Sequence, residues 1–179
     1  DADPEMVALA EQNTPSAISC RVKFLAMDAA ALEFPAESFD VVLARHAPVY
    51  PAEVARVLRP GGVFVTQQIG ARNHANITAL FGCGPDGRYR RDPEQTVAAW
   101  AEAFAAQGCV IRARGEYDVP YFYRDAASLL LWLRTSPIPE DFDIERHWPQ
   151  IDHILREFQT PRGIVTNVHR ELLIVQKPR

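Results

Sequence analysis

The sequence has few of the features that mark secreted, metal-binding or membrane-spanning proteins. It has only three cysteines in 179 residues, Cys20, Cys83 and Cys109, and none of them belongs to a C-x-x-C pair. A disulfide framework or a zinc site is therefore not expected, and a reducing, cytoplasmic location is predicted. The histidines at positions 147, 153 and 169 also lack the spacing of metal ligands, so we predict no metal site.

Long apolar runs and a secretory signal are also absent. A membrane span needs about 18 consecutive apolar residues, and the stretch Leu129–Leu133 is far shorter. The net charge of −4 gives no general attraction to nucleic acid or to anionic membranes. The cluster Arg88, Arg90 and Arg91 is the local exception, and we interpret it as a solvated loop. The sequence therefore favours a small-molecule partner over nucleic acid or a membrane, and it does not indicate an oligomeric state.

The segment from Phe34 to Gly70 contains the strongest structural pattern. A strand at Val41–Ala44 is followed by a helix that Pro51 opens, a tight turn at Arg59–Gly62 and a second apolar strand at Val63–Thr66. Strand, helix and strand with continuous apolar strands predict a parallel βαβ unit that is covered on both faces. Ligands bind such sheets at the carboxyl ends of the strands, where this sequence places Arg45, His46, Gln67 and Gln68.

The rest of the chain also alternates helices and strands. Asp3 and Pro4 predict the start of a helix that reaches about Asn13, and Asp92, Pro93 and Gln95 predict the start of another that Gly108 ends. Further helices are predicted at 76–81, 125–134 and 145–158, and further strands at 22–27, 109–114 and 168–176.

The order of these motifs resembles a known family, the class I S-adenosylmethionine-dependent methyltransferases with a small methyltransferase domain. The segments that carry the resemblance are Asp1-Ala2-Asp3-Pro4-Glu5-Met6, Met27-Asp28-Ala29, Ser38-Phe39-Asp40 and Val57-Leu58-Arg59-Pro60-Gly61-Gly62. The resemblance is specific from Asp1 to Gly70 and weaker to Arg179. It implies an α/β fold: a Rossmann-like, doubly wound, mostly parallel sheet with an antiparallel last strand and a helical insertion before it.

The resemblance also implies S-adenosylmethionine as the cofactor and assigns residues to it. Asp1, with Ala2 beside it, would bind the ribose hydroxyls, because the two oxygens of a carboxylate match a vicinal diol. Asp28 would bind the adenine amino group, and the backbone N–H of Ala29 would meet the ring. Arg45 is assigned to the cofactor as well. An ordinary structural role is the alternative for Asp28, since many aspartates at strand ends cap the next turn.

One expected motif does not occur. The family has a loop of the G-x-G-x-G kind after its first strand, and Gly82, Gly84 and Gly87 do not follow a parallel strand. We therefore expect residues 1–179 to be a single methyltransferase-like domain that lacks its natural N-terminal segment. Residues 117–167 would be a helical lid or insertion that roofs the substrate pocket.

The acceptor is assigned to residues at the carboxyl edge and to an aromatic stretch. We expect His46, Gln68, Tyr121 and Tyr123 to bind the substrate in one cavity, with His46 as the candidate general base. The alternative for His46 is that it is an ordinary hydrogen-bonded polar residue with no catalytic role. The alternative for the tyrosines is that they are ordinary core aromatics.

The predicted function is methyl transfer from S-adenosylmethionine to a small-molecule acceptor by in-line displacement. Three alternatives stay open: an RNA or protein methyltransferase, a non-catalytic domain with this fold, and a nicotinamide oxidoreductase, which also uses an acidic residue at the ribose.

Overall fold

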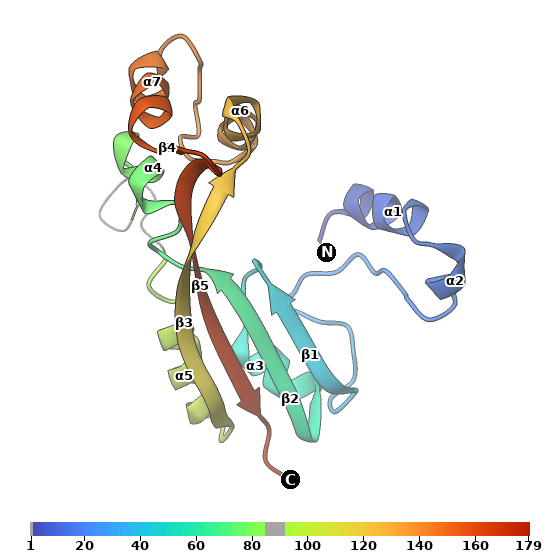
Figure 1. Cartoon of the computed structure of the whole chain (residues 1–179). Helices are drawn as coiled ribbons and strands as arrows, with labels where there is room; N and C mark the ends of the chain where they lie inside the picture. Colours follow the sequence, from blue (N-terminus) through green and yellow to red (C-terminus); the bar gives the residue numbers. More distant parts are fainter. Residues whose placement is uncertain (1, 85–91) are drawn as a thin grey trace. The chain divides into compact units, whose positions relative to one another are not determined.

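The computed structural model describes residues 2–84 and 92–179, so Asp1 and the cluster Arg88, Arg90 and Arg91 lie outside the described residues (Figure 1). The helices are α1 (Pro4–Gln12), α2 (Ser16–Ser19), α3 (Pro51–Val57), α4 (Ala75–Leu80), α5 (Val97–Ala106), α6 (Ala126–Thr135) and α7 (Trp148–Glu157). The strands are β1 (Phe39–Arg45), β2 (Leu58–Ile69), β3 (Val110–Tyr123), β4 (Gln159–Thr160) and β5 (Gly163–Gln176).

The strands form one sheet in the order β1-β2-β5-β3, with β4 paired antiparallel to β5. β1, β2 and β3 point the same way and β5 runs against them (Figure 1). The helices α6 and α7 lie between β3 and β5 in the chain. These features confirm the predicted fold, a mostly parallel Rossmann-like sheet with an antiparallel last strand and a helical insertion before it.

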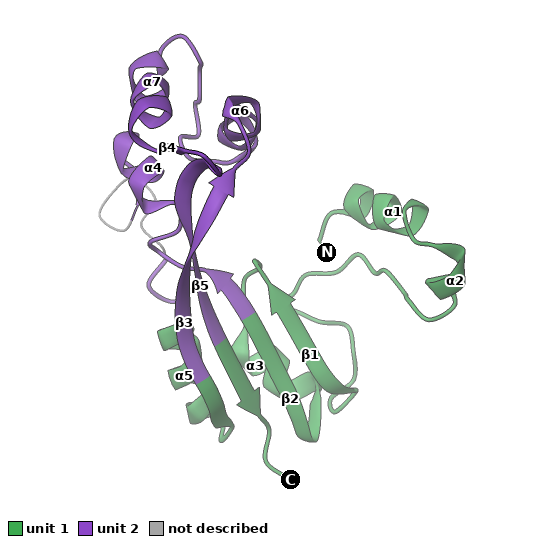
Figure 2. Ribbon diagram, viewed as in Figure 1, with its two compact units in different colours: residues 1–66, 97–113, 173–179 green, residues 67–96, 114–172 purple. Residues whose placement is uncertain are grey.

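The chain divides into two compact units (Figure 2). Unit 1 comprises Asp1–Thr66, Val97–Ala113 and Leu173–Arg179, and unit 2 comprises Gln67–Thr96 and Arg114–Leu172. β2, β3 and β5 each pass from one unit into the other along their length. Each unit has its own hydrophobic core.

The core of unit 1 lies where α3 and α5 pack on the sheet. Leu58 and Phe104 are fully buried, and the rings of Phe64 and Phe104 are 5.1 Å apart between centroids. Gly61 has a φ of +82°, which glycine adopts without steric cost. β2 already starts at Leu58, so the turn predicted at Arg59–Gly62 lies within the strand and not before it. The ammonium group of Lys177 donates to the carbonyl oxygens of Ala55 and Leu58 and so satisfies acceptors at the end of α3.

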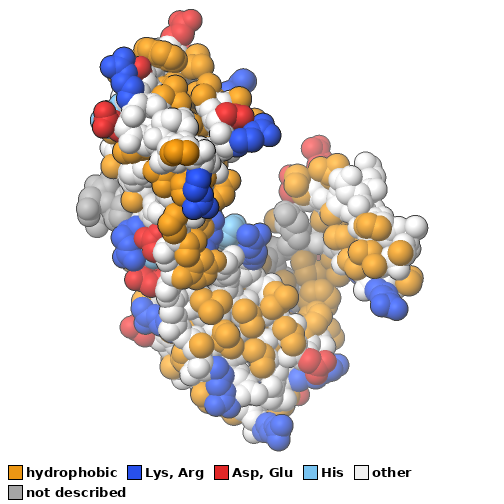
Figure 3. Space-filling model, viewed as in Figure 1, with side chains coloured by type: hydrophobic (Ala, Val, Ile, Leu, Met, Phe, Trp, Pro, Cys, Tyr) orange, Lys and Arg blue, Asp and Glu red, His pale blue; other side chains and the backbone are white. Residues whose placement is uncertain are grey.

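β1 is buried on one face only, which corrects the prediction of a strand covered on both faces. Val42 and Ala44 pack against the core, but Val41 is 55% exposed and Leu43 is 73% exposed. Strand alternation explains the difference, because residues 41 and 43 point away from the face that α3 and α5 cover. Hydrophobic side chains accordingly gather on the surface over the strands of unit 1 (Figure 3). The helices α1 and α2, also in unit 1, contain no buried residue.

Two predicted elements differ from the structure. Residues 22–27 are not a strand, because within the described parts of the chain they form no ladder with another strand, and a strand needs a neighbour for its backbone hydrogen bonds. The helix expected from Asp92 begins at Val97. Asp92 instead accepts a hydrogen bond from the backbone N–H of Glu94 at 2.9 Å, so it caps a turn that precedes the helix.

The core of unit 2 joins α4, α6 and α7 to β5 and to the end of β3. Ile77, Leu129, Leu133, Ile154 and Ile164 are fully buried there. α6 begins with a capping box: the side chain of Asp125 accepts from the backbone N–H of Ser128, and the hydroxyl of Ser128 is 3.2 Å from the backbone N–H of Asp125. β3 continues to Tyr123 and β5 starts at Gly163, so only the central part of residues 117–167 is helical.

Candidate functional site

The residues assigned to the cofactor lie in unit 1. Asp28 is exposed, and its Oδ1 accepts from the backbone N–H of Ala30 at 2.8 Å. One carboxylate oxygen therefore caps the turn at Ala29–Ala31. This is the structural role that the sequence analysis gave as the alternative for Asp28. Its Oδ2 has no hydrogen-bond partner in residues 2–84 or 92–179, so this oxygen is available for a ligand.

Arg45 and His46 stand at the carboxyl end of β1. Both side chains are exposed, and His46 has a φ of +54°. A positive φ is uncommon for a residue other than glycine, and strained backbone tends to occur at functional sites. Ala2 is exposed beside the start of α1. The roles of these residues and of Asp28 stay predictions.

The residues assigned to the acceptor, other than His46, lie in unit 2. Tyr121 and Tyr123 are two residues apart on β3, and their ring centroids are 5.1 Å apart in an edge-to-face arrangement. The structure therefore brings these two predicted residues together. Two further rings, those of His74 and Trp132, complete a group that we call the His74 cluster: His74, Tyr121, Tyr123 and Trp132.

The imidazole of His74 lies among the other three rings. Its centroid is 4.5 Å from that of Trp132, 5.7 Å from that of Tyr123 and 5.8 Å from that of Tyr121. The residue is only 5% exposed, and its Nδ1 has no hydrogen-bond partner among the described residues. Burial, with a smaller contribution from the positive charge of Arg170, lowers the pKa of His74 to about 4. At neutral pH the ring is therefore uncharged and has one nitrogen that can accept a hydrogen bond.

His74 is held in place by its backbone. It has a φ of +52° and precedes the short helix α4. Asn167 on β5 fixes this bend, because its carbonyl oxygen accepts from the N–H of His74 at 3.0 Å and its Oδ1 accepts from the N–H of Ala75 at 2.8 Å. The Nδ2 of Asn167 donates to the carbonyl of Arg72 at 2.7 Å and to Asp118 at 2.8 Å. One side chain thus joins the segment that carries His74 to β3 and β5.

A second histidine, His169, stabilises the same segment. It is 1% exposed, and its Nδ1 accepts from the backbone N–H of Arg72 at 3.1 Å. The ring proton therefore lies on Nε2, which faces Oε2 of Glu116 at 3.1 Å. The guanidinium of Arg72, 3.0 Å from Oε1 of Glu116, lowers the pKa of that carboxyl, and the bond to His169 adds to the effect. Both nitrogens of His169 have partners, so this group is structural.

Gly70 is needed for this arrangement. A Cβ at Gly70 would lie 1.9 Å from Nδ1 of His169, which no side chain tolerates without displacement of the ring. The backbone N–H of Gly70 also donates to the carbonyl of His169 at 2.9 Å. The glycine that ends the second strand in the sequence thus makes room for a buried histidine on β5.

The side chains of the two glutamines at the end of β2 lie in different surroundings, as the alternation of side chains along a strand predicts. Gln68 is 7% exposed, whereas the amide of Gln67 donates to the hydroxyl of Tyr117 at 2.6 Å. The assignment of Gln68 to the substrate and the single cavity expected for His46, Gln68 and the tyrosines stay predictions.

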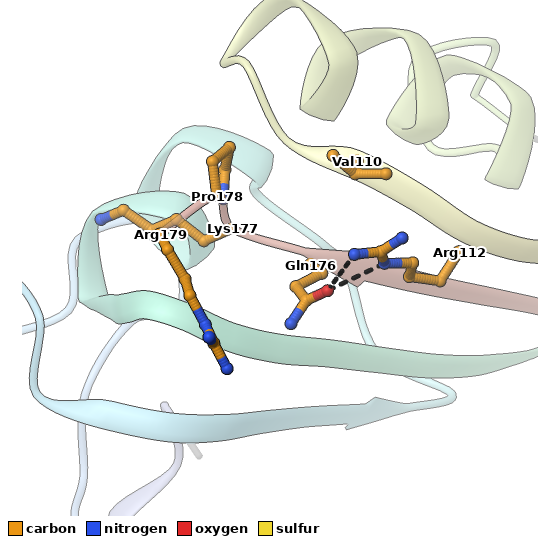
Figure 4. Close-up of a pocket in the computed structure, with 6 residues that line it drawn as sticks. All are labelled: Val110, Arg112, Gln176, Lys177, Pro178 and Arg179. Atoms are coloured by element: carbon orange, nitrogen blue, oxygen red, sulfur yellow. Dashed lines mark hydrogen bonds between the residues drawn. The ribbon is translucent and has the colours of Figure 1, made fainter.

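Two pockets in unit 1 do not contain predicted site residues. One of about 250 Å³ is lined by Val110, Arg112, Gln176, Lys177, Pro178 and Arg179 (Figure 4). Its polar groups serve the fold, because Arg112 donates to Gln176 and Lys177 donates to carbonyls at the end of α3. The other, of about 370 Å³, is lined by Glu11, Thr14, Ser19, Val22, Lys23, Phe24 and Leu25.

No group of three or more His, Cys, Asp and Glu side chains is arranged to hold a metal ion in residues 2–84 and 92–179. Over the same residues, none of the helices is long and apolar enough to cross a membrane.

His74 is the residue that the sequence analysis missed. It follows Gly70 in a polar segment, where a lone histidine carries no pattern that separates it from a loop residue. Its burial depends on aromatic residues from β3 and α6, which are distant in the sequence. The aromatic stretch itself was a usable signal, since two of its members belong to the cluster.

Residues 1–66 match a family described as methyltransferase domain. A relative, the 2-methyl-6-phytyl-1,4-hydroquinone methyltransferase of Synechocystis sp., is 32% identical over 119 residues, which are 60% of this chain and 37% of the relative. The chain thus spans less than half of that relative's length.

Solved structures share the fold. A Bacillus halodurans protein proposed to be a methyltransferase matches with a TM-score of 0.62 at 16% identity, over 100% of this chain and 81% of that one. The YcgJ protein of Bacillus subtilis matches with a TM-score of 0.60 at 21% identity and the same coverage. Together with the sheet order and the antiparallel β5, these matches define a Rossmann-like methyltransferase fold. The match of residues 1–66 to the methyltransferase domain agrees with this fold.

Proposed function

We propose that the protein transfers a methyl group from S-adenosylmethionine to a small, partly apolar acceptor. The observation that carries the proposal is the family match over residues 1–66, which contain all the residues assigned to the cofactor. The hydroquinone named for the relative supports a small acceptor, and the aromatic residues of the His74 cluster are of the kind that line small-molecule sites.

The proposed cofactor roles are those that the resemblance to class I methyltransferases implies for these positions. Asp28, through Oδ2, binds the adenine amino group, and the N–H of Ala29 meets the adenine ring. Asp1 and Ala2 bind the ribose, and Arg45 supports the cofactor at the end of β1. His46, Gln68, Tyr121 and Tyr123 contact the acceptor, with His46 as the base where the acceptor has a proton to lose.

The cofactor already carries a reactive methyl group on a positively charged sulfur, so the protein mainly has to align the reactants. Positioning of this kind can contribute roughly 7–11 kcal/mol in favourable cases. We propose that the protein acts without a metal and in the cytoplasm.

The test is the affinity of the full-length protein for S-adenosylmethionine, measured by calorimetry. A hydrogen bond to a charged group contributes about 1.5–3 kcal/mol, so Asp28→Ala should weaken binding by about 10-fold or more. Asp40→Ala is the matched control, because Asp40 forms an exposed ion pair with Arg59 at 2.8 Å and should leave the affinity unchanged. Unchanged affinity in a folded Asp28→Ala variant would remove Asp28 from the site.

A wild-type protein that binds no S-adenosylmethionine would overturn the proposed function and favour a non-catalytic domain. If the protein binds S-adenosylmethionine, transfer of a labelled methyl group to small phenols, to RNA or to protein distinguishes the acceptor classes.

A further inference from the structure

The Nδ1 atom of His74 is a buried polar atom that lacks a partner among the described residues. Native structures pair nearly all buried polar groups, because an unpaired one loses the hydrogen bonds that it makes to water in the unfolded chain. The residue also has a left-handed backbone, with a φ of +52° and a ψ of +39°. Three hydrogen bonds to Asn167 hold this bend, at His74, Ala75 and Arg72. The unpaired nitrogen is therefore fixed in position and is not a loosely placed surface group.

The surroundings of this nitrogen are aromatic. Tyr123 is 5% exposed and Trp132 is half-buried, whereas Tyr121 is 43% exposed. The ring of Tyr121 meets that of His74 edge to face, with an interplanar angle of 80°. Tyr121 is the exposed member of the cluster, and its ring contacts that of His74. Flat aromatic ligands gain most from such a site, since aromatic pairs contribute beyond their buried area.

We propose that the His74 cluster is a binding site for a hydroxylated aromatic compound, whose hydroxyl group pairs with Nδ1 of His74 and whose ring packs against Tyr121 and Trp132. The proposal rests on the proposed function and names the chemical class of its acceptor. His74 is then a specificity residue that contacts the acceptor directly.

The nature of the polar group follows from the imidazole. A neutral ring presents Nδ1 as an acceptor in one tautomer and as a donor in the other. A hydroxyl fits both tautomers, because it donates and accepts. An ammonium group is disfavoured, because the positive charge of Arg170 acts on the same ring.

The experiment measures the binding of methylhydroquinone and of its dimethyl ether, without S-adenosylmethionine, by calorimetry and by tryptophan fluorescence. The two probes share a ring and differ in the hydroxyl groups. We expect the wild-type protein to bind methylhydroquinone at least 10-fold more tightly, because the ether cannot donate to His74. His74→Phe keeps a ring and lacks the nitrogen, so it should bind both probes equally. His153→Phe, at an exposed histidine on α7, is the matched control and should keep the preference.

A second measurement needs no substitution and is therefore independent of folding defects. In protein labelled with ¹⁵N in the imidazole rings, methylhydroquinone should move the Nδ1 resonance of His74, and the dimethyl ether should leave it in place. Equal binding of the two probes to the wild-type protein, or an unchanged Nδ1 resonance at saturation, would overturn the proposal. A preserved hydroxyl preference in a protein that binds no S-adenosylmethionine would keep this site and reject the methyltransferase activity.

Discussion

At the scale of single residues, Gly70 has the least room for a side chain among the glycines in the described part of the chain. Gly70→Ala places a Cβ 1.9 Å from Nδ1 of His169, a ring that hydrogen bonds to Arg72 and Glu116 hold in place. We expect a loss of roughly 1–3 kcal/mol in the free energy of unfolding, the range for overpacked interiors, measured by urea denaturation. Gly115→Ala is the control, because nothing lies within 4 Å of its Cβ position. Equal stability of the two variants would contradict this account of the glycine.

His74 makes stability depend on pH in a defined direction. Its pKa is about 4 in the folded protein and 6.5 in the unfolded chain, so the unfolded state binds more protons between these values. The contribution of His74 to the free energy of unfolding is complete above pH 6.5, where the ring is uncharged in both states. It is lost as the pH falls towards 4. Between pH 8 and pH 5 the protein should lose roughly 2 kcal/mol of stability through this residue.

Urea denaturation at the two pH values tests this dependence. His74→Asn should remove it, since asparagine does not titrate and accepts a left-handed backbone. His153→Asn should keep it, because that side chain is exposed. An unchanged pH slope in His74→Asn would show that other groups carry the effect.

At the scale of elements, α6 illustrates how one helix divides between core and surface. Leu133 is fully buried in the core of unit 2, whereas Leu131, two residues earlier, is 64% exposed. Leu133→Ala should therefore cost about 2–5 kcal/mol, through lost burial and the cavity left behind. Leu131→Ala on the same helix should change stability by less than about 0.5 kcal/mol. Thermal and urea unfolding of both variants would test this, and similar losses would contradict the assigned helix face.

Elements with local signals were predicted well. Asp3 and Pro4 fix the start of α1, and Pro51 fixes the start of α3. The continuous apolar run at Val63–Thr66 lies within β2, as predicted. The failures are those that depend on distant neighbours. The apolar residues at 22–27 look like a strand, but a strand exists only with a partner. Asp92 has the chemistry of a helix cap, and the structure uses it to cap a turn instead.

In the candidate site, too, the residues with a local sequence signal were predicted and those that depend on distant contacts were not. Tyr121 and Tyr123 were predicted because an aromatic stretch next to a strand is visible in the sequence. The role of His74 depends on Asn167 and on Trp132, which lie far along the chain and reach it only through the fold. Side chains that act through such distant contacts carry no local pattern to recognise.

At the scale of the whole molecule, the exposed face of β1 has a measurable consequence. Leu43 is 73% exposed. Hydrophobic side chains gather on the surface over the strands of unit 1 (Figure 3). Leu43→Lys should leave the free energy of unfolding within about 0.5 kcal/mol and should lower the binding of the dye ANS. Leu58→Ala, at a fully buried position of the same unit, should instead cost about 2–5 kcal/mol. A large loss of stability in Leu43→Lys would contradict the exposure of this face.

The close approach of Gly70 to His169 also limits how related sequences can vary. Any side chain at position 70 would occupy the volume that the imidazole fills, so the two positions cannot change independently. A lineage that replaces the glycine must first, or at the same time, replace the histidine by a smaller residue. The carboxylate of Glu116 and the backbone N–H of Arg72 would then need other partners. Positions 70 and 169 should therefore covary among relatives, with 116 as the third member of the set.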